Sequence, residues 1–221
     1  MPLILHIETS TSICSAAISS DGTIICEKMS TDSLSHAGNA GIFVEEIIDN
    51  LNGNRLDAVA VSSGPGSYTG LRIGASLAKG LCFGYNIPLI AVSTLRLLAL
   101  QAAAIIGSRD NSLICPMIDA RRMEVYASVY DFSLVEISPV HAEIITPSSY
   151  ESLLSDRQIY FCGNGASKCR EMIVHPNAVF VDNIYPSAKD MTLLAEAAWA
   201  AGQFEDTAYF EPLYLKEWGQ K

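Results

Sequence analysis

Basic residues are scarce in this sequence. Its 221 residues include 14 lysines and arginines against 24 aspartates and glutamates, which gives a net charge of −10. A protein that binds nucleic acid by itself usually presents a basic surface, because contacts to the phosphate backbone supply much of the affinity. The composition therefore argues against a stand-alone nucleic-acid binder. Charged residues make up only 17% of the chain and hydrophobic residues 49%, which excludes intrinsic disorder.

Long apolar runs are also missing. The longest candidate, Leu97 to Ile106, is interrupted by Gln101 and is far shorter than the roughly 20 residues that cross a bilayer. The first residues carry no basic segment followed by a long apolar one, so we expect no signal peptide. The sequence therefore predicts a cytoplasmic protein.

Motifs for metal binding and nucleophilic catalysis are absent too. The six cysteines include no Cys-x-x-Cys pair, the four histidines include no His-x-x-x-His pair, and no serine stands in Gly-x-Ser-x-Gly. We expect reduced, buried thiols, no metal site and no catalytic residue in this chain. His6 lies in an apolar strand and is expected to be a hydrogen-bonded core residue.

An alternating pattern of strands and helices fills the first hundred residues. Short apolar runs predict strands, and apolar residues at helical spacing, such as Val44, Ile47, Ile48 and Leu51, predict helices. The predicted strands are 3–8, 13–19, 23–29, 56–62 and 88–92, and the predicted helices are 35–51, 71–84 and 94–106. Three strands joined by turns, followed by strands joined through helices, indicate an α/β fold with a mixed sheet.

The second half repeats this theme after a polar, turn-rich break at residues 107–111. We expect strands at 113–118, 124–130, 135–145, 158–162 and 178–181, a short helix that starts near 146–149, and a helix over 188–201. The break predicts two domains. These are an N-terminal lobe of residues 1–107 and a C-terminal lobe of residues 108–221.

The first two strands are connected by Glu8, Thr9, Ser10, Thr11 and Ser12. Backbone N–H groups and hydroxyls in such a hairpin can surround a phosphate, and the acid can hold a metal ion or its waters. Serine and threonine are also common turn formers. Local chemistry leaves a phosphate-binding loop and a structural turn equally open.

The second predicted helix follows a glycine-rich loop, residues 64–70. A loop of this kind at a helix N-terminus can bind an anion, but this one matches neither the P-loop nor Gly-x-Gly-x-x-Gly. Gly70, Gly74 and Ala78 recur every four residues, which lets another backbone approach closely. This row can pack on the chain's own sheet or against a partner, and both interpretations stay open.

A third motif, residues 119–124, has the sequence Asp-Ala-Arg-Arg-Met-Glu. It follows a predicted strand of the second half at the position that matches the first hairpin. One interpretation, by internal symmetry, is a second phosphate-facing hairpin. The other is a solvated turn with an ion pair.

Together these segments resemble the TsaB family, also called YeaZ, of bacterial tRNA threonylcarbamoyladenosine biosynthesis proteins. The resemblance rests on residues 4–12 and 63–74 and extends to residues 119–126 and 212–216. It implies an actin-like (ASKHA, ribonuclease H-like) two-lobe fold, with a mixed five-stranded sheet in the N-terminal lobe and a reduced C-terminal lobe.

The resemblance also implies a function without catalysis by this chain. In the family, the subunit pairs with the catalytic subunit TsaD and is joined by the ATPase TsaE. The assembly transfers a threonylcarbamoyl group to N6 of adenosine 37 in tRNAs that read ANN codons. The chain alone forms homodimers, and tRNA is reached only through the complex. No cofactor is expected to be bound tightly by this chain, whereas ATP or ADP and Mg²⁺ are expected within the complex. No association with a membrane is expected.

The resemblance places the partner surface on the first two helices of the N-terminal lobe. The residues expected there are Val44, Ile47, Ile48, Leu51, Tyr68, Thr69, Gly70, Arg72, Gly74 and Ala78. A bulky charge at Gly74 or Ala78 is then expected to weaken pairing while the fold survives.

Three other functions compete with this one, and one of them is a homodimeric scaffold without a role in tRNA modification. An active actin-like ATPase or small-molecule kinase is favoured by the hairpin at residues 9–12 and disfavoured by the short second lobe, because adenine needs a formed pocket there. A metallopeptidase-like protein is disfavoured by the missing histidine pairs.

Overall fold

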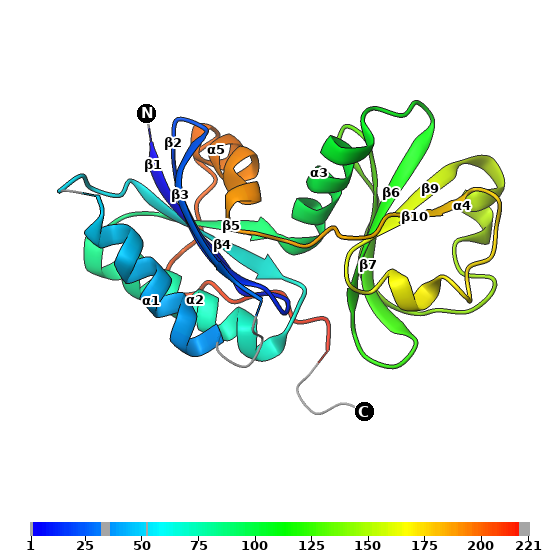
Figure 1. Ribbon diagram of the computed structural model, residues 1–221, viewed down its shortest axis with the longest axis horizontal. Helices are drawn as coiled ribbons and strands as arrows, with labels where there is room; N and C mark the ends of the chain where they lie inside the picture. Colours follow the sequence, from blue (N-terminus) through cyan, green and yellow to red (C-terminus); the bar gives the residue numbers. More distant parts are fainter. Residues whose placement is uncertain (1, 32–35, 52, 217–221) are drawn as a thin grey trace. The chain divides into compact units, whose positions relative to one another are not determined.

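The computed structural model describes residues 2–31, 36–51 and 53–216. The chain divides into two compact units (Figure 1). Unit 1 combines Met1–Thr94 with Pro186–Lys221, and unit 2 is Leu95–Tyr185. Each unit contains one mixed five-stranded sheet, which confirms the predicted α/β class.

The strands of unit 1 are β1 (Leu3–Glu8), β2 (Cys14–Ser20), β3 (Thr23–Ser30), β4 (Ala58–Gly64) and β5 (Leu89–Ser93). Their order in the sheet is β3-β2-β1-β4-β5. The first three strands pair antiparallel, and β4 pairs parallel with both β1 and β5. Asp21 and Gly22, between β2 and β3, have φ of 48° and 73°, the left-handed conformation of a tight Asp-Gly hairpin turn. The mixed sheet and this turn are as predicted.

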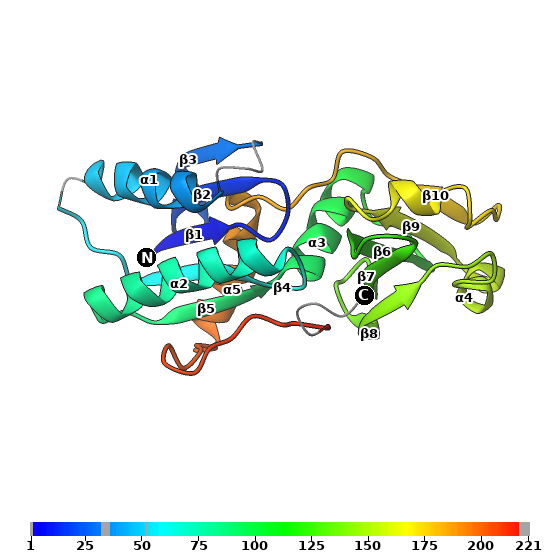
Figure 2. The ribbon, with the colours of Figure 1, turned by 90° about the horizontal axis from the view of Figure 1, so that it is seen from below.

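The helices of unit 1 lie on both faces of its sheet. Helices α1 (His36–Asp49) and α2 (Tyr68–Tyr85) cover one face, and α5 (Thr192–Ala200) lies on the other (Figures 1 and 2). Leu5 and Ile7 of β1 belong to the core under α1 and α2, so the alternate residue His6 points to the opposite face.

The ends of α1 and α2 differ from the prediction. Helix α2 starts three residues earlier than expected, because the Ser67 hydroxyl accepts a hydrogen bond from the Gly70 N–H at 3.3 Å and caps the helix. The predicted start of the first helix at Ser35 lies outside the described residues.

The strands of unit 2 are β6 (Ser112–Asp119), β7 (Glu124–Asp131), β8 (Glu136–Ile144), β9 (Gln158–Cys162) and β10 (Ala178–Phe180), in the order β10-β9-β6-β7-β8. Helix α3 (Thr94–Ile106) packs Leu95, Leu98 and Ala102 against one face of this sheet. Helix α4 (Glu151–Asp156) contributes Leu154 to the core on the other face, around Phe161.

The domain boundaries differ from the predicted division at residues 107 and 108. Helix α3 belongs to unit 2, because its apolar side chains form the core over β6 and β9. The chain after Tyr185 returns to unit 1. There the Glu205 N–H bonds the Leu89 carbonyl at 2.9 Å, and Phe210 is buried in the core under α1 and α2. A local change of composition marks a polar turn, but it does not reveal that a distant segment completes the first unit.

All six cysteines are free, and five of them are buried, as predicted. Burial raises the pKa of Cys14, Cys82 and Cys169 to about 11 and that of Cys162 to about 12. These thiols are therefore protonated at neutral pH. Because the reactive form of cysteine is the thiolate, they are expected to be unreactive. Within the described ranges, no helix combines the length and apolarity needed to cross a membrane.

His6 is fully buried in β1, and its Nε2 forms a hydrogen bond with the Ser19 Oγ at 2.8 Å, which confirms the predicted core histidine. Its Nδ1 has no hydrogen-bond partner among the described residues. Burial lowers the pKa of His6 from 6.5 to about 3, because the imidazolium would lose its hydration. His6 is therefore neutral in the folded protein at neutral pH.

This burial predicts a loss of stability in mild acid. The unfolded chain protonates His6 below pH 6.5, whereas the folded chain resists protonation until about pH 3. The contribution of neutral His6 is thus present above pH 6.5 and is lost as the pH falls toward 3. We expect His6 to lower the free energy of unfolding by about 2 kcal/mol between pH 7 and pH 5. Urea denaturation of the wild type and of His6→Gln measures this. The same pH dependence in both proteins would contradict the assignment.

Candidate functional site

The first part of the hairpin between β1 and β2, residues 8–10, is buried within unit 1. Glu8, Thr9 and Ser10 are fully buried. The Ser10 N–H donates to Glu8 Oε1 at 2.5 Å, and the Thr9 hydroxyl donates to the Gly70 carbonyl at 2.7 Å. The Ser10 carbonyl accepts from the Ser67 N–H at 2.6 Å. Two donors that a phosphate would need are thus engaged inside the protein, which favours the structural interpretation of this hairpin.

Three glycines make this closure possible. A Cβ atom at Gly66 would overlap the Ser10 carbonyl, one at Gly70 the Thr9 carbonyl, and one at Gly74 the Thr9 hydroxyl. Only a residue without a side chain lets α2 and the loop before it approach the hairpin this closely. The glycine row therefore packs on the chain's own hairpin, one of the two interpretations that the sequence left open.

This packing corrects part of the predicted partner surface. Gly70, Gly74 and Ala78 are on the buried side of α2, so a bulky charge at Gly74 or Ala78 would disturb the fold before it reached a partner. On the neighbouring helix and just after it, Val44, Ile47 and Leu51 are also buried in the core of unit 1. Their helical spacing correctly predicted an amphipathic helix, but the apolar face points inward.

The exposed side of α2 carries a different set of residues, which we call the α2 ridge. Arg72, Thr69 and Ser76 are exposed in its first half, and Gly80 and Phe83 in its second half. Of the predicted partner residues, Thr69 and Arg72 are on this ridge, and Tyr68 and Ile48 are half-buried. Phe83 is 87% exposed. Ser76, Gly80 and Phe83 were not among the predicted residues, although they share the helical spacing of Thr69 and Arg72.

Two grooves lie on either side of the ridge. The groove between α1 and α2 has a volume of about 720 Å³ and is lined by Gly41, Tyr68, Thr69, Arg72, Ile73, Ser76 and Leu77. The other, about 760 Å³, lies between α2 and the C-terminal segment. The Arg72 guanidinium lies 4.3 Å from the centre of the Tyr68 ring. The centre of the Tyr214 ring, on the C-terminal segment, lies 5.0 Å from the centre of the Tyr68 ring. The start of the ridge is therefore held by a cation–π contact and a tilted pair of aromatic rings.

The C-terminal segment is fastened to α2 by a lysine. Lys79 Nζ donates to the carbonyls of Ala208 and Phe210 at 3.1 and 3.0 Å. Farther along, the Leu213 N–H bonds the Ser63 carbonyl at 2.8 Å. The wall of the second groove is thus formed by a segment more than 120 residues away in the sequence.

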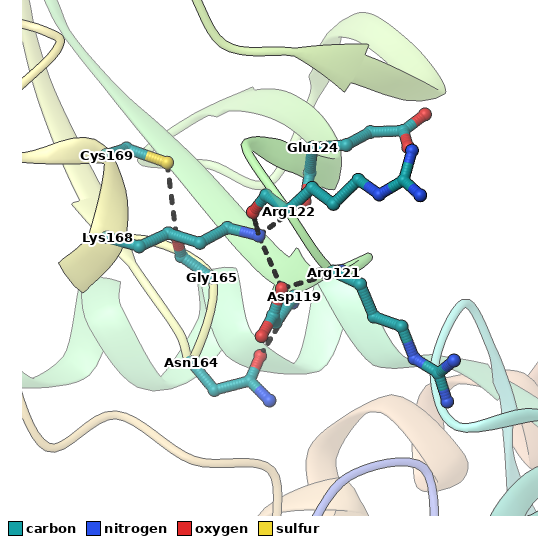
Figure 3. A network of polar contacts seen from close by, with 8 residues as sticks. All are labelled: Asp119, Arg121, Arg122, Glu124, Asn164, Gly165, Lys168 and Cys169. Atoms are coloured by element: carbon teal, nitrogen blue, oxygen red, sulfur yellow. Dashed lines mark hydrogen bonds and ion pairs between the residues drawn. The ribbon is translucent and has the colours of Figure 1, made fainter. Parts of the chain in front are cut away.

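The third motif forms the hairpin between β6 and β7 in unit 2 (Figure 3). Asp119 makes an ion pair with Lys168, which confirms a turn with an ion pair, although the cation comes from outside the motif. The described residues contain no group of three or more histidine, cysteine, aspartate or glutamate side chains arranged to hold a metal ion.

The chain is similar to a family of known proteins. Residues 24–217 match the family model described as TsaD, tRNA N6-adenosine threonylcarbamoyltransferase. Curated relatives are named tRNA threonylcarbamoyladenosine biosynthesis protein TsaB. The protein from Bacillus subtilis is 33% identical over 77% of this chain and 74% of its own length. The protein from Haemophilus influenzae is 30% identical over 96% of this chain and 93% of its own length. The solved structure of YeaZ from Pseudomonas aeruginosa, 27% identical, matches 97% of this chain and all of its own with a TM-score of 0.83.

The glycine packing generates a test of the hairpin closure. Gly70→Ala places a methyl group on the Thr9 carbonyl and should lower the free energy of unfolding by about 2 kcal/mol or more. The matched control is Gly80→Ala in the same helix, where a Cβ meets nothing within 4 Å. That change should raise the free energy of unfolding by up to about 1 kcal/mol, because alanine favours helix. Urea denaturation decides, and similar effects at both positions would disprove the packing argument.

Proposed function

The chain belongs to the TsaB family of tRNA threonylcarbamoyladenosine biosynthesis proteins, and from that premise we propose that it is a non-catalytic partner subunit of the transferase complex. It pairs with a TsaD-type catalytic subunit and recruits a TsaE-type ATPase. The cytoplasmic assembly transfers a threonylcarbamoyl group to N6 of adenosine 37 in ANN-decoding tRNAs. Alone, the chain forms a homodimer through the same surface.

The exposed surface of α1 and α2 carries this proposal. The α2 ridge has two small residues at its centre, Ser76 and Gly80. At its end it has an exposed aromatic residue, Phe83. On α1, Ile42 is 50% exposed. Small residues let a second helix approach closely, and large exposed apolar side chains favour burial by a partner. This is the surface that a helix-to-helix contact requires.

The identity of the partner follows from the chain's own likeness. Residues 24–217 match the family model named for the transferase, so a TsaD-type partner has elements equivalent to α1 and α2. Two chains of the same fold can join through equivalent faces around a pseudo-two-fold axis. The same reasoning supports a homodimer in the absence of the partner.

A supporting rather than catalytic role is consistent with the state of the polar groups in unit 1. The Thr9 hydroxyl and the Ser10 N–H are engaged with Gly70 and Glu8. His6 is buried, and burial lowers its pKa to about 3. We assign ATP hydrolysis to the TsaE-type subunit and tRNA chemistry to the TsaD-type subunit, with no nucleotide held tightly by this chain.

Reconstitution tests the proposed function. The chain is combined with its cognate TsaD-type and TsaE-type subunits, threonylcarbamoyl-adenylate, ATP and an unmodified ANN-decoding tRNA. We expect modified tRNA with all components and none when this chain is left out. Product formed at the full rate without the chain would refute the proposal. Tight binding of ATP and Mg²⁺ by the chain alone, measured by calorimetry, would favour an actin-like ATPase instead.

The ridge is tested by a charge at its end. Phe83→Asp should weaken pairing with the TsaD-type subunit at least tenfold, because a buried apolar anchor is replaced by a charge that loses its hydration. The matched control is Val174→Asp in unit 2, where the side chain is 82% exposed against 87% for Phe83. Sizing chromatography and calorimetry should show normal pairing for the control. Equal affinity for both variants would remove the ridge from the interface.

A further inference from the structure

The two adjacent basic residues of this acidic chain occupy the tip of one hairpin. Arg121 and Arg122 are the only neighbouring lysines or arginines in the sequence. They lie between β6 and β7 in unit 2, and both are exposed. With Asp119, Glu124 and the Lys168 that pairs with Asp119, the hairpin has a formal charge of +1 in a protein of net charge −10.

The hairpin below these arginines is rigid. Lys168 Nζ donates to the carbonyls of Arg122 and Glu124 at 2.7 and 2.6 Å and pairs with the Asp119 carboxylate (Figure 3). All three N–H donors of this lysine are thereby used. The Asp119 carboxylate also accepts the Arg121 N–H at 2.8 Å, and the Asp119 N–H donates to Asn164 Oδ1 at 3.0 Å. The charge of Asp119 is thus balanced by Lys168, and the Arg121 guanidinium points away from it (Figure 3).

The backbone of the tip does not favour arginine. Arg121 and Arg122 have φ of 71° and 51°, a left-handed conformation that costs a residue with a Cβ roughly 1–2 kcal/mol. Glycine or asparagine would adopt it more easily. Two long cations at these positions therefore oppose the local preference, which indicates that the side chains serve a purpose other than folding.

The two guanidinium groups are available for a ligand. No hydrogen bond or ion pair holds either side chain among the residues that the structure describes, and in Figure 3 the two leave the hairpin in different directions, with the Glu124 side chain extending toward the side of Arg122. Other cations of the chain are engaged within it, namely Lys28, Lys79, Lys168, Arg170 and Lys189.

We propose that Arg121 and Arg122 contact phosphate groups of the tRNA when this chain acts within its complex, an inference that rests on the proposed function. A guanidinium binds a phosphate through two parallel hydrogen bonds, and a fixed backbone reduces the entropic cost of binding. A nucleic-acid strand supplies closely spaced phosphates, so two diverging arginines can each meet one. The hairpin thus provides a local point of attraction on a chain whose net charge repels RNA.

The experiment removes the charges and keeps the turn. The double variant Arg121→Asn/Arg122→Asn suits the left-handed conformation. The control, Arg109→Asn/Arg157→Asn, removes two other exposed arginines of unit 2 and changes the net charge equally. Binding of an unmodified ANN-decoding tRNA transcript is measured for the complex with the TsaD-type subunit, and for the chain alone at about 50 mM salt. Sizing chromatography measures complex formation separately.

We expect the hairpin variant to form the complex normally and to bind tRNA roughly tenfold more weakly than the control. The slope of log K against log salt should fall by about 1 for each phosphate that the variant no longer binds. Equal tRNA binding by the two double variants, in the complex and in the chain alone, overturns the proposal. If the hairpin variant fails to form the complex, the arginines contact a carboxylate of the partner protein and not the tRNA. That result also overturns the proposal. A wild-type chain that forms no complex refutes the proposed function, while the measurements on the chain alone still decide the role of the arginines.

Discussion

The contact between Thr9 and the glycine side of α2 determines how unit 1 is built. The Thr9 hydroxyl bonds the Gly70 carbonyl at 2.7 Å, and the Thr9 backbone occupies the space that a side chain at Gly70 would need. This contact holds the N-terminal end of α2 against the first hairpin. It also fixes the rotation of α2 about its axis, because only positions without a side chain leave room for the hairpin.

The orientation of α2 decides which of its residues meet solvent. Once Gly70, Gly74 and Ala78 face inward, the opposite side of the helix presents Arg72, Ser76 and Phe83. The C-terminal segment then fastens to the flank of α2 through Lys79 and forms the wall of a second groove. The glycine-rich loop and the start of α2 therefore pack against the first hairpin of the same unit.

The sequence predicts the local elements of this fold well and their faces less well. Strand β1 has the predicted bounds of residues 3–8, because a short apolar run ended by polar residues defines it. The faces of α1 and α2 are harder to predict. Apolar spacing at Val44 and Ile47, or small residues at Gly70 and Gly74, shows that one side of a helix is packed, but the covering element comes from elsewhere in the chain.

Long-range contacts also explain the missed boundary between the units. Residues 186–216 are apolar enough to be a core segment of either half, and nothing in their order shows that Phe210 joins the core beneath α2. Hydrogen bonds such as Glu205 to Leu89 span more than a hundred residues. Such pairings depend on the assembled sheet, whose edge strand β5 offers free backbone groups only after it has formed.

Net charge likewise describes the chain as a whole and not its individual surfaces. A value of −10 argues against RNA binding by a uniform surface, yet electrostatic attraction is screened within about 10 Å at ordinary salt. A phosphate near Arg121 therefore responds mainly to the charges of that hairpin. There the Asp119 carboxylate is balanced by Lys168, Glu124 lies on the side of Arg122, and the Arg121 side chain extends away from both (Figure 3). The net charge of −10 therefore sets the overall repulsion of a polyanion, whereas the charges of this hairpin set the local attraction.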